Sequence, residues 1–287
     1  MGVCLIQVPY MAGDDRHGSS RGPKRLLEAG ASRVLAARGI RVTLETIDRG
    51  EPFRDTAASA ARVNKQLAAV VRKAVDAGQF PIVLAGSCNS SLGVVAGFDH
   101  AGCGAVWLDA HADFNTPEST LSGFFPGMSL AVISGHCYRQ YWAEIGDSTP
   151  IAEDAIVMYG VRDLRPEAER ERLERSGIQV VEWRDGKPSG DLVAPLEQLA
   201  RRVQEIYLHI DFDGFAPEVA PGIVDEPVPG GLSFEDAEGI MRAAAERFRI
   251  RAATLATYTP ELDKEERTLR VGLRIIELLG GLTQQSR

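Results

Sequence analysis

Acidic residues follow two apolar segments of this 287-residue chain. The two runs are Trp107-Leu108-Asp109-Ala110-His111-Ala112-Asp113 and His209-Ile210-Asp211-Phe212-Asp213. In an extended chain, residues i, i+2 and i+4 point the same way, so Asp109, His111 and Asp113 should share one direction. Asp211 and Asp213 should share another. If the two segments are close in space, four carboxylates and an imidazole converge.

Such a cluster would be costly without cations, because like charges at short range disfavour one another and buried carboxylates need partners. Neither run contains Lys or Arg. Two divalent cations would balance the four carboxylates, and oxygen and imidazole ligands suit Mn²⁺ and related ions, which can activate a water molecule. The alternative is that acids at strand ends cap helices or form loops, which applies best to Asp211 and Asp213 taken alone. The two runs together predict a metal site.

The elements that must position these residues form an α/β pattern. Residues 82–85, 105–108 and 206–208 are continuous apolar runs, typical of parallel strands covered by helices on both faces. Ligands bind beyond the carboxyl ends of such strands, where the acidic runs lie. Further strands are predicted at Val3–Pro9, Arg41–Ile47, Ala155–Gly160, Gln179–Trp183 and Ala252–Ala256. Helices are predicted at Pro23–Arg38, Thr56–Ala77, Ser90–Gly97, Pro166–Ser176, Asp191–Arg202, Ser233–Arg247 and Lys264–Leu279.

Composition excludes several classes of protein. The chain is 44% hydrophobic and 25% charged, which is typical of a globular protein, and residues 1–287 are predicted to form one α/β domain. Its net charge of −8, without a basic stripe, argues against nucleic acid or an anionic membrane as partners. No secretory signal is visible and no apolar run reaches the ~18 residues of a membrane span, so a cytoplasmic location is predicted. The four cysteines form no CxxC pair and are predicted to be reduced thiols.

The acidic runs resemble those of the ureohydrolase superfamily, which includes arginases, agmatinases and formimidoylglutamases. The resemblance rests on two segments, Asp109-Ala110-His111-Ala112-Asp113-Phe114-Asn115 and Asp211-Phe212-Asp213-Gly214-Phe215-Ala216-Pro217. It implies a parallel sheet of about eight strands flanked by helices, and hydrolysis of a guanidinium or amidine carbon with two Mn²⁺ ions. It also implies a homo-oligomer, commonly a trimer or hexamer.

The resemblance assigns roles to individual residues. Asp109 and Asp211 would bridge the two metals, Asp113 would bind the first, and His111 and Asp213 would bind the second. The remaining family ligand is a histidine, which Cys88 replaces in the segment Ala85-Gly86-Ser87-Cys88-Asn89. A thiolate is softer than imidazole and less suited to Mn²⁺, so the first metal is expected to be weakly held, exchanged for another ion or absent. With a cysteine at this position, the chain resembles the branch of the superfamily that contains Nω-hydroxyarginine amidinohydrolases.

Residues after the first acidic run are expected to bind substrate. Asn115, Thr120 and Ser122 fall on the family's carboxylate-binding positions, where neutral donors can bind a carboxylate. The alternative is a surface turn. These positions favour a small guanidino or amidino acid as substrate, with Asp113, Asp109 and Asp211 as the catalytic acids.

Three positions depart from the family. Pro126 stands where the family has a catalytic histidine, and Thr257 stands where arginases have a glutamate that meets the guanidinium. Arg165 replaces an aspartate, and it would either attract a second carboxylate or lie at the surface. Two possible substitutes for the lost glutamate are Glu226 and Glu261. The departures leave three hypotheses: a hydrolase of guanidino or hydroxyguanidino acids, a formimidoylglutamase-like amidine hydrolase, and a non-catalytic homologue.

Overall fold

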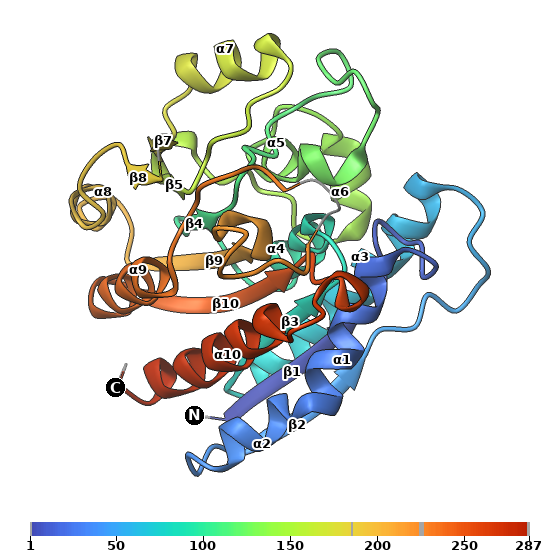
Figure 1. The fold of residues 1–287 in the computed structure, drawn as a ribbon. Coiled ribbons are helices and arrows are strands. Elements are labelled where there is room, and N and C mark those ends of the chain that lie inside the picture. Colours follow the sequence, from blue (N-terminus) through green and yellow to red (C-terminus); the bar gives the residue numbers. More distant parts are fainter. Residues whose placement is uncertain (1, 185, 224–226, 286–287) are drawn as a thin grey trace.

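A parallel sheet of eight strands forms the centre of the molecule (Figure 1). The computed structural model of the chain describes residues 2–184, 186–223 and 227–285. The strand order is β2-β1-β3-β10-β9-β4-β5-β6, and every pairing is parallel. The strands are β1 Gly2–Val8, β2 Val42–Thr46, β3 Gln79–Ala85, β4 Gly104–Leu108, β5 Ile156–Tyr159, β6 Gln179–Val181, β9 Glu205–Asp211 and β10 Arg249–Ala256. A short antiparallel pair, β7 Trp183–Arg184 and β8 Lys187–Pro188, lies outside the sheet. The predicted fold class is therefore confirmed.

Helices cover both faces of the sheet. One layer contains α1 Gly22–Ala29, α2 Ala31–Ala36, α9 Phe234–Arg247 and α10 Arg267–Gln285, which contact one another (Figure 1). The other contains α3 Thr56–Asp76, α4 Ser91–Ala96, α5 Ser129–Ile133 and α6 Arg139–Ile145. The remaining helices are α7 Glu167–Arg175 and α8 Ala194–Leu199. The inner strands are buried on both faces, which explains their continuous apolar sequences.

Several predicted elements are wrong in detail. The continuous helix predicted over 23–38 is divided into α1 and α2 by Gly30, whose φ of 116° lies in the left-handed region that glycine tolerates. The strand predicted over 179–183 is divided between β6 and β7. Helices α5 and α6 were not predicted, because their sequences carry too short an amphipathic pattern to reveal a helix.

The strand order places Cys88 and the two acidic runs at the carboxyl ends of neighbouring central strands. Strands β3, β10, β9 and β4 are successive neighbours, and Ala256 of β10 pairs with both Ala85 and Asp211. On the other side of β9, Ile210 pairs with Leu108 of β4. The segments after these four strands therefore start side by side, as the convergence of the two acidic runs requires.

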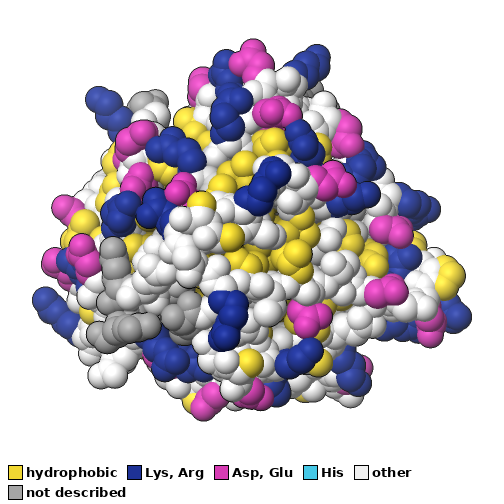
Figure 2. Space-filling view, turned by 90° about the horizontal axis from the view of Figure 1, so that it is seen from below, with side chains coloured by type: hydrophobic (Ala, Val, Ile, Leu, Met, Phe, Trp, Pro, Cys, Tyr) yellow, Lys and Arg dark blue, Asp and Glu magenta, His cyan; other side chains and the backbone are white. Residues whose placement is uncertain are grey.

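The charged side chains on the surface are mixed in sign, as the absence of a basic stripe in the sequence predicts. The face in Figure 2 carries Lys and Arg side chains interspersed with Asp and Glu rather than gathered into one patch. Within the ranges that the structure describes, no helix is both long and apolar enough to cross a membrane.

Candidate metal centre

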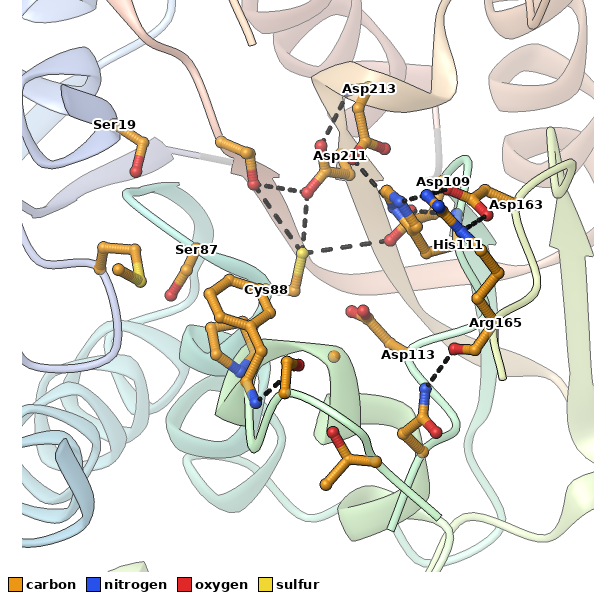
Figure 3. Close-up of a pocket in the computed structure, with 18 of the residues that line it drawn as sticks. Ser19, Ser87, Cys88, Asp109, His111, Asp113, Asp163, Arg165, Asp211 and Asp213 are labelled. Carbon is orange, nitrogen blue, oxygen red and sulfur yellow. Dashed lines mark hydrogen bonds and ion pairs between the residues drawn. The ribbon is translucent and has the colours of Figure 1, made fainter. Parts of the chain in front are cut away.

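The second acidic run begins at the last residue of β9. Asp211 closes the strand, and Asp213 lies in the single 3₁₀ turn Phe212–Gly214 that follows. The backbone N–H of Asp213 donates to Asp211 Oδ1 at 2.8 Å, which fixes the first carboxylate against the turn. Both side chains point into the same pocket (Figure 3).

The first acidic run bends instead of continuing β4. The strand ends at Leu108, and Asp113 has a left-handed φ of 49°. The carbonyl oxygen of Asp113 accepts the N–H groups of Leu130 and Ala131, so the start of α5 holds this turn. The extended geometry expected for residues 109–113 is therefore wrong, although Asp109, His111 and Asp113 all line the pocket.

Cys88 and the carboxylates of Asp109 and Asp211 form one group. Cys88 lies in the 3₁₀ turn Cys88–Ser90 after β3, and its Sγ is 2.8 Å from Asp211 Oδ2 and 4.0 Å from Asp109 Oδ2 (Figure 3). Trp107 Nε1 donates to the same oxygen of Asp109 at 3.0 Å, which orients that carboxylate. The side chains of Cys88, Asp109 and Asp211 are all buried.

Asp109 also belongs to a second group with His111 and Asp213. His111 Nδ1 is 3.1 Å from Asp213 Oδ2 and 3.4 Å from Asp109 Oδ1. Ligand atoms of these three residues lie within 4.8 Å of one another. Asp113 is not part of either tight group, although its side chain points toward them in Figure 3.

Burial and mutual repulsion dominate the electrostatics of the cluster. Burial and the charge of Asp213 raise the pKa of Asp109 to about 7. Burial and neighbouring carboxylates likewise raise the pKa values of Asp113 and Asp211 well above the ordinary range. Burial opposes protonation of His111, but the charge of Asp213 and the hydrogen bonds that the ring donates to Asp109 and Asp163 prevail and raise its pKa. Protons therefore compensate the charges when no cation is present.

The residues fit divalent cations. Asp113 Oδ2 and His209 Nε2 are buried without a hydrogen-bond partner among the described residues, which is costly unless a ligand meets them. Carboxylate and imidazole donors suit Mn²⁺, Zn²⁺ and related ions, and a thiolate donor suits Zn²⁺ better than Mn²⁺. A cation would replace the protons on the carboxylates and lower their pKa values.

Three residues near the site were not singled out from the sequence. Asp163 Oδ2 lies 3.7 Å from His111 Nε2, and Glu169 accepts the backbone N–H of Phe114 at 3.0 Å. Their partners are distant in sequence, so no motif reveals them. His209 could have been found, because it precedes Asp211 by two residues and shares its face of β9. Burial lowers its pKa to about 3, so the ring is neutral.

The predicted carboxylate-binding residues line the same cavity, which has a volume of about 610 Å³. Thr120 Oγ1 accepts the N–H of Gly123, and Ser122 Oγ accepts that of Phe124. Each hydroxyl therefore keeps its own proton for another acceptor. Asn115 makes two hydrogen bonds with protein groups, since its Nδ2 donates one proton to the carbonyl of Arg165 and its Oδ1 accepts from Ser119.

The residues that depart from the family pattern lie in or beside the cavity. Pro126 and Thr257 line the cavity, and Thr257 Oγ1 donates to Asp211 Oδ2 at 2.5 Å. Arg165 is at the rim, 79% exposed, with its Nε 2.6 Å from Asp163 Oδ1. Glu261 pairs with Arg21 and does not line the cavity. Glu226 lies outside the described residues.

Comparison with known proteins identifies the family. The Arginase family model matches residues 1–280, so the chain belongs to the arginase family. It is 30% identical to the arginase of Brevibacillus brevis, with 97% of each chain covered. The structure resembles the arginase of Bacillus subtilis with a TM-score of 0.85 and 27% identity, covering 98% of this chain and 99% of that one. It equally resembles Entamoeba histolytica arginase in complex with L-ornithine, with a TM-score of 0.85, 28% identity and 98% of each chain covered.

Proposed function

We propose that this protein hydrolyses a C–N bond of a guanidino or hydroxyguanidino acid, releasing urea or a urea analogue and an amine. The observation that carries the proposal is that one cavity combines a metal-ligand cluster on its floor with uncharged hydroxyl donors on its wall. Membership of the arginase family supports the same class of reaction.

Two divalent ions would be held by the cluster, with Mn²⁺ as the ion that the family resemblance implies. Cys88, Asp109, Asp113 and Asp211 would hold the first, and Asp109, Asp211, His111 and Asp213 the second. Bound ions would polarise the substrate carbon and lower the pKa of a water molecule. The water oxygen would end in the urea product, and the leaving nitrogen would gain a proton. Asp113 has a free buried oxygen and can hold that proton.

The wall of the cavity favours a substrate with a carboxylate. The hydroxyl protons of Thr120 and Ser122 are not used by the hydrogen bonds of their own loop, and hydrogen bonds to a charged acceptor are comparatively strong. The complex of E. histolytica arginase with L-ornithine supports an amino acid skeleton for the ligand.

The floor of the cavity favours a hydroxyguanidine over a guanidinium. Thr257 is uncharged and its hydroxyl is occupied by Asp211, so it offers no counter-charge to a cation. A hydroxyguanidine is less basic than a guanidine and depends less on such a counter-charge.

The test is a panel of substrates that differ in one group. L-Arginine, Nω-hydroxy-L-arginine and their decarboxylated analogues are incubated with the protein and Mn²⁺ or Zn²⁺, and urea, hydroxyurea and ornithine are measured. We expect the hydroxyguanidino acid to be hydrolysed with the highest kcat/KM. Equal or faster hydrolysis of L-arginine would contradict the preference, and no hydrolysis of any member would favour the non-catalytic hypothesis.

Arg165 leaves a formimidoylglutamase-like activity as a second candidate, because its exposed guanidinium at the rim can meet a second carboxylate. Asp163 already pairs with that guanidinium and neutralises part of its charge. If this candidate is correct, Arg165→Ala raises KM for formimidoylglutamate much more than it changes kcat.

The homo-oligomer and the cytoplasmic location stay predictions.

A further inference from the structure

The imidazole of His209 is buried beneath the candidate metal centre. Its ring stacks on Trp107 with centroids 3.7 Å apart, and its Nδ1 is 3.0 Å from the hydroxyl of Tyr207. The Tyr207 hydroxyl donates its only proton to Thr254 Oγ1 at 2.8 Å. Its oxygen must therefore accept the Nδ1 proton of His209. This chain of hydrogen bonds leaves the lone pair of His209 on Nε2.

That lone pair has no partner among the described residues of the protein. A ligand atom of His209 lies within 4.8 Å of ligand atoms from Cys88, Asp109 and Asp211, all of which are buried. A buried nitrogen without a hydrogen bond is disfavoured, whereas the same lone pair on a cation is a strong donor. Nδ1 bonded to an oxygen, with Nε2 free, is the usual arrangement of a metal-binding histidine.

We infer that His209 Nε2 is a ligand of the ion held by Cys88, Asp109 and Asp211, and that this set selects Zn²⁺ over Mn²⁺. The inference rests on the proposed metal centre and adds a ligand, His209, that the family resemblance does not assign to it. Sulfur and imidazole donors favour Zn²⁺ over Mn²⁺. The second group, Asp109, His111 and Asp213, has no sulfur and does not share this preference.

Metal affinity in two variants tests the role of the free nitrogen. His209→Asn keeps a polar group near Tyr207 but removes Nε2, whereas Tyr207→Phe keeps Nε2 and removes only the outer hydrogen bond. We expect His209→Asn to weaken the tighter Zn²⁺ site more than 100-fold, measured by chelator competition, and to change Mn²⁺ affinity less than tenfold. Tyr207→Phe should cost no more than the roughly 10–100-fold typical of an outer-shell partner. Equal Zn²⁺ affinity of folded His209→Asn and the parent would overturn the inference.

X-ray absorption gives an answer that does not depend on folding of the His209 variant. His111→Asn protein is loaded with one equivalent of Zn²⁺, so that the imidazole of the second group cannot contribute. We expect one sulfur at about 2.3 Å together with imidazole scattering. A sulfur and oxygen shell without imidazole would overturn the inference. Because this readout needs no turnover, the ligand set is decided even if no guanidino acid is hydrolysed.

Discussion

Thr257 occupies a backbone conformation that is unusual for its residue type. Its φ of 68° lies in the left-handed region, where a β-branched side chain is strained. The residue is held there by two contacts, from its N–H to Ala85 O and from its hydroxyl to Asp211 Oδ2. The hydroxyl therefore orients a carboxylate of the cluster, at the position where the family resemblance implies a glutamate.

Thr257→Glu should shift the substrate preference toward L-arginine. The new carboxylate can pair with a guanidinium, and a hydrogen bond to a charged group is worth about 1.5–3 kcal/mol, or roughly 10–100-fold in kcat/KM. The ratio of kcat/KM for L-arginine to that for Nω-hydroxy-L-arginine should rise by that factor. Thr257→Gln is the control, because it has the same size without the charge. An equal rise in both variants would show that size, and not charge, changes the preference.

Ser122→Ala should weaken binding of substrates that carry a carboxylate. The Ser122 hydroxyl accepts the N–H of Phe124 and keeps its own proton for an acceptor in the cavity. We expect KM for the preferred acid to rise about tenfold or more with little change in kcat, and KM for the decarboxylated analogue to stay constant. Equal increases in KM for the acid and for its analogue would mean that Ser122 supports the conformation of the loop and does not bind the carboxylate.

At the scale of elements, α7 connects to the metal centre through Glu169. This buried carboxyl accepts the N–H of Phe114, the residue directly after Asp113, and so fixes the end of the first acidic run. Burial raises its pKa to about 7. Between its ordinary pKa and pH 7, the folded state therefore binds more protons at Glu169 than the unfolded state, and stability falls as pH rises.

Glu169→Gln should remove this part of the pH dependence. The amide oxygen can still accept from Phe114, and the variant has no proton to lose. From pH 5 to pH 8, we expect the free energy of unfolding of the metal-free parent to fall by roughly 2.5 kcal/mol more than that of the variant. Urea denaturation at the two pH values measures the difference. Parallel pH profiles would mean that Glu169 is ionised in the folded protein.

How much the sequence predicts differs between elements. The apolar runs of β3, β4 and β9 identify buried strands, because such strands need no polar face. The break at Gly30 was not predicted, although a glycine in the left-handed region commonly ends a helix. The bend at Asp113 was not predicted because it depends on contacts with Leu130 and Ala131 of another segment. The same holds within the site: the acidic residues of the two motifs line one cavity, whereas Asp163 and Glu169 depend on partners about 50 residues away.

At the scale of the whole molecule, the sheet gathers four carboxylates from two separate segments in one buried place. Desolvation and repulsion raise the pKa values of Asp109, Asp113 and Asp211, so the metal-free protein must hold protons there at neutral pH. The fold therefore carries a site that binds either protons or cations, and stability, metal content and pH are linked.

The gain in stability on adding Zn²⁺ or Mn²⁺ should consequently shrink as pH falls. Binding must displace protons, and Asp109, with a pKa of about 7, is largely protonated at pH 6 and largely ionised at pH 8. At a metal concentration about 100-fold above the Kd at pH 8, we expect stabilisation of about 2.7 kcal/mol, and clearly less at pH 6 with the same concentration. Unfolding measured with and without metal at each pH gives both values. Asp109→Asn, which cannot release that proton, should show weaker binding and a flatter pH dependence. Stabilisation that is equal at both pH values would mean that the carboxylates are already ionised without metal.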